Sequence, residues 1–271
     1  MAPFRFLDLP REVRDNIYSI LLCTFPPPDS ITRGIMLSKE DFSPSILRVN
    51  KQIYSESYDI MIKGNRFVLV TSHGGLHFVN ILRKNDVPIL ALEPVLDIKH
   101  AVNNYPSVQS FRGHAVHVTI GNSEPKWEDD LPPSPHLRPA HMVMLFRDLE
   151  FLCHAIMEGD DLLEDYMDVV LVGIHLAPVA KDPPFQLEAL TTYFSSTKIQ
   201  EQLLEPFRRG ICNQPRVDIG GIIEKSLAQS ALDDFARDKF EDADALIESW
   251  TAIEARGTKL FNQGNRGCLK H

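Results

Sequence analysis

The chain has 271 residues, of which 44% are hydrophobic and 24% charged, and its formal net charge is −9. These values are typical of a folded globular protein and argue against extensive disorder, while the acidic balance argues against nucleic-acid binding, which needs a basic face. No apolar run approaches the ~20 residues that span a bilayer, and the N-terminus lacks the features of a secretory signal, so we expect a protein of the cytoplasm or nucleus.

Residues 9–22 predict the first helix. The fixed φ of Pro10 suits a first helical turn, and Glu12 lies where an N3 carboxylate can reach back to the amide of Leu9. An apolar stripe follows at helical spacing, formed by Val13, Ile17, Ile20 and Leu21. The other faces of this helix carry Arg11, Arg14, Asp15 and Ser19. We expect Val13, Ile17 and Leu21 to be largely buried, either within the chain or against a partner.

Residues 46–61 predict a second amphipathic helix that packs against the first. Pro44 and Ser45 mark its start. The residues that keep helical spacing on its inner face are Ile46, Val49, Ile53, Ser57 and Ile60, of which four are apolar. Gly64 and Asn65 then indicate a helix stop, and residues 66–71 read as a strand.

These two helices carry a pair of motifs. Residues 9–21 read Leu-Pro-Arg-Glu-Val-x-x-x-Ile-Tyr-x-x-Leu, and residues 46–56 read Ile-Leu-Arg-Val-Asn-Lys-Gln-Ile-Tyr-x-Glu, followed by Asn-Arg-Phe at 65–67. In this order the motifs resemble the large fungal family of F-box-like proteins. The insert between them, residues 23–44, is longer than in the standard module, and Tyr54 stands where many F-boxes place a tryptophan.

The resemblance implies a helical module over residues 1–64 and a substrate-selecting body over residues 65–271. An F-box binds the Skp adaptor subunit of a cullin-based ubiquitin ligase. The residues expected to bind that partner are Leu9, Pro10, Val13, Ile17, Leu21, Ile46 and Val49.

The body alternates helices and strands, which predicts an α/β or α+β fold with about four or more strands flanked by helices. The predicted strands lie at residues 66–71, 111–120, 168–177 and 216–219. The predicted helices lie at residues 76–84, 142–157, 199–207 and 222–254. We expect the strands to be largely parallel, the helical module and the body to share one core, and residues 123–139, which are rich in proline, to form an exposed loop.

Signatures of catalysis are lacking, and we expect no enzyme activity and no cofactor. Gly220 and Gly221 follow a strand, where backbone amides could hold a phosphate, but a tight turn is the better explanation. The four cysteines are scattered, which favours free thiols over a zinc site or disulfides.

Two histidine pairs are candidates for metal ligands. His73 and His77 are separated by two glycines that oppose a continuous helix. The odd spacing of His114 and His117 predicts that they point to opposite faces of a strand. We therefore expect no metal site at either pair.

The leading hypothesis is an F-box-like adaptor that recruits a protein substrate to a Skp-cullin ubiquitin ligase. The alternative is a non-catalytic scaffold or binding protein in which the helical module is only structural. A small-molecule enzyme that uses the Gly220–Gly221 turn is the least supported.

Overall fold

The structure of the protein is a computed structural model, and it shows a mixed α/β fold. The described residues are 5–25, 30–32, 35–37, 43–73, 78–93, 108, 111, 113–122, 140–157, 170–176, 187–214, 216–237 and 251. The N-terminal part contains η1 (Phe6–Asp8), α1 (Arg11–Cys23), β1 (Ser30–Thr32), β2 (Ile35–Leu37), η2 (Pro44–Arg48) and α2 (Lys51–Asn65). We refer to η1, α1, η2 and α2 as the head.

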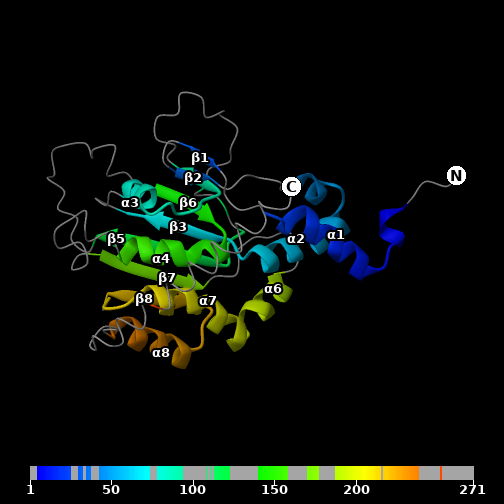
Figure 1. The fold of residues 1–271 in the computed structure, drawn as a ribbon. Helices are drawn as coiled ribbons and strands as arrows, with labels where there is room; N and C mark the ends of the chain where they lie inside the picture. Colours follow the sequence, from blue (N-terminus) through cyan, green and yellow to red (C-terminus); the bar gives the residue numbers. More distant parts are fainter. Residues whose placement is uncertain are drawn as a thin grey trace, which may run out of the picture.

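The described elements that follow α2 form the body. Its first elements are β3 (Val68–Ser72), α3 (Phe78–Lys84), β4 (Ala91–Glu93), β5 (Val116–Asn122), β6 (Ala140–Met144), η5 (Phe146–Asp148) and α4 (Leu149–Met157). The later elements are β7 (Val170–Leu176), α6 (Leu187–Phe194), α7 (Thr197–Gly210), β8 (Val217–Gly221) and α8 (Lys225–Ala236). Figure 1 shows the head at one end of the body, joined to it through α2.

The body is built on a six-stranded sheet with the order β4-β6-β3-β5-β7-β8. Strands β3 and β5 are parallel, as are β7 and β8, whereas β6 is antiparallel to both β3 and β4, and β5 is antiparallel to β7. The expectation of largely parallel strands is therefore wrong. The strands β3, β5, β7 and β8 confirm the four that the sequence predicts.

Strand β6 is the main error in the predicted elements. Residues 142–157 were expected to form one helix, but Ala140–Met144 pairs with β3, and α4 begins only at Leu149. The run Met142-Val143-Met144-Leu145 is apolar at every position, so its periodicity favours neither a strand nor a helix. Pairing with β3 on one side and β4 on the other makes Ala140–Met144 an interior strand of the sheet. Strand β4 was not predicted because it has only three residues.

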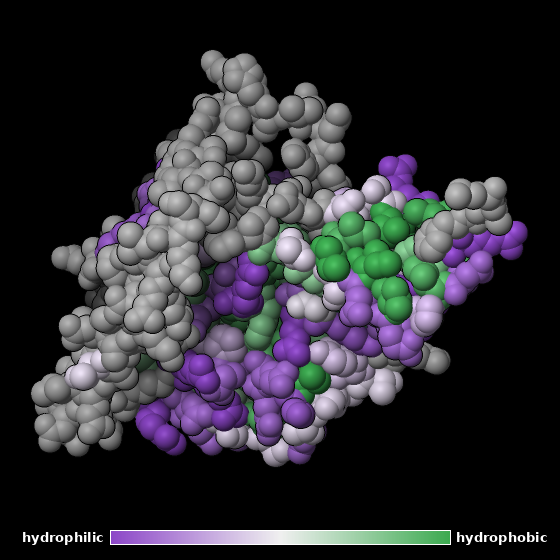
Figure 2. Space-filling view, turned by 45° about the vertical axis from the view of Figure 1, so that its right-hand side comes forward, coloured by the Kyte–Doolittle hydropathy of each residue, from purple (hydrophilic) through white to green (hydrophobic). Residues whose placement is uncertain are grey.

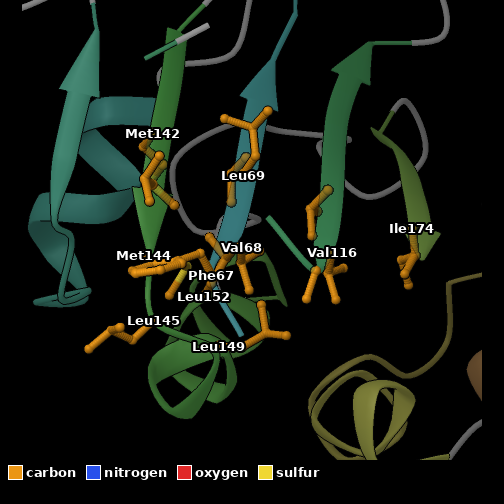
Figure 3. Close-up of a cluster of buried hydrophobic side chains, with 14 of the residues drawn as sticks. Phe67, Val68, Leu69, Val116, Met142, Met144, Leu145, Leu149, Leu152 and Ile174 are labelled. Carbon is orange, nitrogen blue, oxygen red and sulfur yellow. The ribbon is translucent and has the colours of Figure 1, made fainter. Parts of the chain in front are cut away.

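One face of the sheet carries the apolar core. Its fully or almost fully buried residues include Val68, Val70, Val116, Val118, Ile120, Met142, Met144, Val172 and Ile174. Figure 3 shows Leu149 and Leu152 of α4 close to Val68 and Met144. The same hydrophobic cluster includes Tyr18, Leu22 and Ile53 of the head. Head and body therefore share one continuous core, as expected.

Packing accounts for the glycine pair at the end of β8. Gly221 has a φ of 91°, and a Cβ atom there would lie 1.9 Å from the carbonyl oxygen of Leu176. A Cβ atom on Gly220 would lie 2.8 Å from Nδ1 of His175. Backbone packing and the positive φ therefore require a glycine at position 221 without any ligand, whereas the contact at Gly220 is only with the exposed side chain of His175.

Several expectations fall outside the described residues: the loop at 123–139, the helix after residue 237, His77 and Cys268. Within the described part of the chain, Cys23, Cys153 and Cys212 are free, and Cys153 is buried. Of the helices in that same part, none combines the length and apolar character needed to cross a membrane.

Candidate functional site

Helix α1 packs against α2 through a face that hydrophobic periodicity does not predict, whereas α2 buries Ile53 and Ser57 of its predicted face. The buried residues of α1 are Arg14, Tyr18 and Leu22. The buried residues of α2 include Ile53, Glu56, Ser57, Met61 and Ile62. The sequence placed Arg14 on an outer face and the apolar stripe against α2, and this assignment is wrong. Arg14 is only 8% exposed.

A bidentate ion pair explains why this face of α1 is buried. Arg14 donates from Nε to Oε2 of Glu56 at 2.9 Å and from Nη2 to Oε1 at 2.8 Å. The hydroxyl of Tyr18 donates to Oε2 at 2.9 Å, and Nε2 of Gln52 donates to Oε1 at 3.0 Å. Parallel N–H bonds to both oxygens are the strongest geometry for such a pair. The carboxylate of Glu56 is therefore fully satisfied although it is buried.

The network also shifts the acidity of its members. The hydrogen bonds from Arg14, assisted by those from Gln52 and Tyr18, lower the pKa of Glu56 from 4.5 to about 2 against the opposing effect of burial. Burial, followed by the contact with Glu56, raises the pKa of Tyr18 from 10.0 to about 12. Glu56 is thus ionised and Tyr18 is neutral across the physiological pH range.

Arg14 also fixes the segment that precedes α1. Its Nη1 donates to the carbonyl oxygen of Leu9 at 2.6 Å and to that of Leu7 at 3.3 Å. Across the interface, Asn50 caps α2, because its side chain accepts a hydrogen bond from the amide of Ile53 at 2.9 Å. The start of both helices is therefore held by polar contacts.

Because α1 turns Arg14, Tyr18 and Leu22 toward the interior, apolar residues on other faces of the head remain exposed. The exposed fraction is 39% for Leu7, 41% for Val13, 67% for Ile20 and 59% for Val49. Among the described residues, the other large hydrophobic side chains with comparable exposure are Phe151 and Leu171 of the body. In Figure 2 the hydrophobic colour gathers at the end of the molecule where Figure 1 places η1 and α1. We name Leu7, Val13, Ile20 and Val49 the exposed apolar set.

The predicted partner-binding residues divide between surface and core. Pro10, Val13 and Val49 are exposed. Leu9 and Ile17 are half-buried. Leu21 and Ile46 are also half-buried, and both pack against the core cluster. The structure thus does not bury Val13 within the chain, and Leu21 and Ile46 contribute in part to folding.

Sequence reasoning missed Leu7 and misjudged Ile20. Leu7 belongs to the 3-10 turn η1, for which helical periodicity provides no signal. Ile20 was included in the apolar stripe, but it is the most exposed member of the set. Tyr18 and Glu56 are fixed positions of the two motifs, and this was the signal in the sequence that could have indicated a polar network between the helices.

The junction between head and body is fixed by the last motif residues, Asn65 and Arg66. Nδ2 of Asn65 donates to the carbonyl oxygen of Leu22 at 2.8 Å. Arg66 ends α2 with a φ of 48°, and its Nη2 donates to the hydroxyl of Tyr193 and to Oε1 of Gln202, both at 2.9 Å. This side chain therefore joins α2 to both α6 and α7.

The geometry gives no support to a metal centre. The rings of His114 and His117 have centroids 5.7 Å apart, so the expectation that they point to opposite faces is wrong. His114 precedes β5, and the alternation of a strand does not apply to it. Within the described ranges, no three histidine, cysteine, aspartate or glutamate side chains are placed to hold a metal ion together.

Comparison with known proteins returns no match to a family model, a curated protein or a solved structure.

Proposed function

We propose that this protein is an F-box-like adaptor of the cytoplasm or nucleus. Its head would bind a Skp-type subunit, and its α/β body would bind a protein substrate. The mechanism is proximity, because an adaptor holds its target near the ubiquitin-transfer machinery and performs no chemistry itself. The proposal joins the motif resemblance to the exposed apolar set of the same part of the chain, which has Val13 and Ile20 on α1, Leu7 in η1 and Val49 directly after η2.

The observation that carries the proposal is the exposure of Val13, Ile20 and Val49. Val13 and Ile20 remain in water on α1, whose opposite face is packed, and Val49 is exposed directly after η2. Exposed apolar side chains of this kind favour a protein-binding surface. The polar network on the inner face fixes the orientation of both helices before a partner arrives. Preorganised side chains lose less conformational entropy on binding.

The rigid junction at Arg66 also suits an adaptor. In addition to its two hydrogen bonds, the guanidinium lies 6.0 Å from the ring centroids of Phe146 and Tyr193. These contacts hold the head in a fixed direction relative to the sheet. A substrate bound to the body would therefore have a defined position relative to the Skp subunit.

Co-purification tests this proposal. Tagged wild-type protein should retain a Skp subunit and a cullin, whereas the double variant Val13→Asp/Val49→Asp should lose both. Because the two side chains are exposed in the free chain, the double variant should keep its fold, as judged by an unchanged circular dichroism spectrum. Phe151→Asp is the matched control, since Phe151 is a similarly exposed apolar residue on the body.

Two outcomes would overturn the adaptor proposal. One is wild-type protein that retains no Skp subunit at micromolar concentration and low salt. The other is equal retention by the wild type and the double variant, which would place the contact away from Val13 and Val49.

A scaffold is the second candidate function. Its support is the single hydrophobic cluster that contains Tyr18, Leu22 and Ile53 together with the body, since a head of this kind also has a purely structural role. This candidate predicts that the head stabilises the body and that no ligase subunit is retained.

A further inference from the structure

The face of the sheet opposite the apolar core concentrates histidines. Five of the six histidines among the described residues lie on it or at its border: His73, His114, His117, His141 and His175. The strand register accounts for this arrangement. His117 on β5 is paired directly with His175 on β7, and His141 on β6 is paired with Thr71 on β3. Four neighbouring strands thus bring imidazoles to one surface.

The hydroxyl of Thr71 connects two of these rings. Its Oγ1 lies 2.9 Å from Nε2 of His117 and 3.2 Å from Nδ1 of His141. A hydroxyl has one proton, so Thr71 can donate to one neutral ring while it accepts from the other. If both rings were charged, both nitrogens would be donors and Thr71 would have no ring acceptor left. Thr71 is only 4% exposed, so few water molecules can replace the lost bond.

The surroundings also oppose charge on these rings. Burial lowers the pKa of His117 below 6.5, and the nearby His175, His141 and His73 act in the same direction. Burial likewise lowers the pKa of His141, with His73 assisting and Glu93 acting in the opposite direction. Glu93 on β4 is paired with His141, and Asp218 lies on the other edge strand, opposite Gly173.

A metal ion is the usual alternative explanation for clustered histidines. The described part of the chain contains no group of three ligand side chains placed for one. We therefore consider protonation of these histidines rather than metal coordination by them.

We propose that the Thr71–His117–His141 cluster is a pH-sensitive switch that holds β6, β3 and β5 together at neutral pH and weakens their contact on acidification. In the folded protein the neutral rings are favoured. The unfolded chain takes up protons as the pH falls below about 6.5, before the folded chain does, so stability is lost in that range. The device is independent of the proposed adaptor function.

Thermal unfolding of the full chain between pH 7.5 and pH 5.5 tests the switch. The informative variant is His117→Gln/His141→Asn, because each amide nitrogen or oxygen can occupy the position of the ring atom bound to Thr71 without titrating. The wild type should lose roughly 5 °C more in Tm over this range than the double variant. The control His154→Gln, at an exposed position of α4, should behave like the wild type.

Equal losses in Tm for the wild type and the double variant would overturn the proposal. If the double variant does not fold, the imidazole resonances of the wild-type protein decide the matter by NMR. His117 and His141 should then titrate below pH 6.5, because burial lowers the pKa of both rings. Titration of both rings at or above pH 6.5 would refute the switch.

Discussion

Helices α1 and α4 are both amphipathic, yet only α4 buries the face that its periodicity predicts. Helix α4 buries Leu149, Leu152 and Ile156. Helix α1 buries Arg14 and Tyr18 together with Leu22 and leaves Val13 and Ile20 of its apolar stripe exposed. The difference teaches that a well-formed ion pair between two helices can occupy the inner face and leave the apolar stripe available to another molecule. Each prediction below tests one side of this contrast.

The largest effect is expected from Leu152→Ala in α4. Leu152 is completely buried in the core cluster. Its truncation removes apolar contacts and leaves a cavity, so the free energy of unfolding should fall by about 3 kcal/mol. Urea denaturation measures this loss. A loss well under 1 kcal/mol would mean that α4 is not packed on the sheet as described.

Glu56→Ala should have the next largest effect, because it leaves the buried guanidinium of Arg14 without its partner. We expect a decrease in Tm of roughly 5 °C. Glu205→Ala is the control: the ion pair of Glu205 with Arg209 is exposed, and its loss should change the Tm by only about 1 °C. Similar Tm values for the two variants would remove the special role assigned to the buried pair.

The carboxylate of Glu56 should make the stability of the protein depend on pH. The pKa of Glu56 is lowered from 4.5 to about 2, so its contribution to stability is present above pH 4.5 and is lost as the pH falls toward 2. Glu56→Gln has no such group. The difference in Tm between wild type and Glu56→Gln should therefore shrink over this interval. A difference that stays constant down to pH 2 would show that ionisation of Glu56 does not stabilise the fold.

The smallest effect is expected from Val13→Ala in α1. Because Val13 is exposed in the free chain, its truncation should change the free energy of unfolding by no more than about 0.5 kcal/mol. Chemical denaturation of Val13→Ala and Leu152→Ala under the same conditions compares the two losses in the free energy of unfolding. A loss above about 1.5 kcal/mol would show that Val13 belongs to the core.

The sequence was sufficient for elements whose pattern is local. Strand β3 and strand β5 are rich in β-branched residues, and α2 ends near Gly64 as predicted. The predicted start of that helix at residue 46 is wrong, because Pro44–Arg48 forms the separate turn η2 and α2 begins only at Lys51, after its cap Asn50.

The sequence was insufficient to predict features that depend on contacts between residues far apart in the chain. Hydrophobic periodicity considers only the spacing of apolar residues. It therefore cannot predict the ion pair between Arg14 and Glu56, which lie 42 positions apart in the sequence. The same limit applies to β6, which becomes a strand only because β3 and β4 flank it.

Hydrogen–deuterium exchange with and without a Skp subunit tests the central claim most directly, that the exposed apolar set is a docking surface. The account predicts slower amide exchange in peptides that cover residues 11–23 and 44–65 when the subunit is present. Peptides that cover residues 149–157 of α4 should exchange at the same rate in both samples. Unchanged exchange across α1 and α2, or protection confined to the body, would contradict the account.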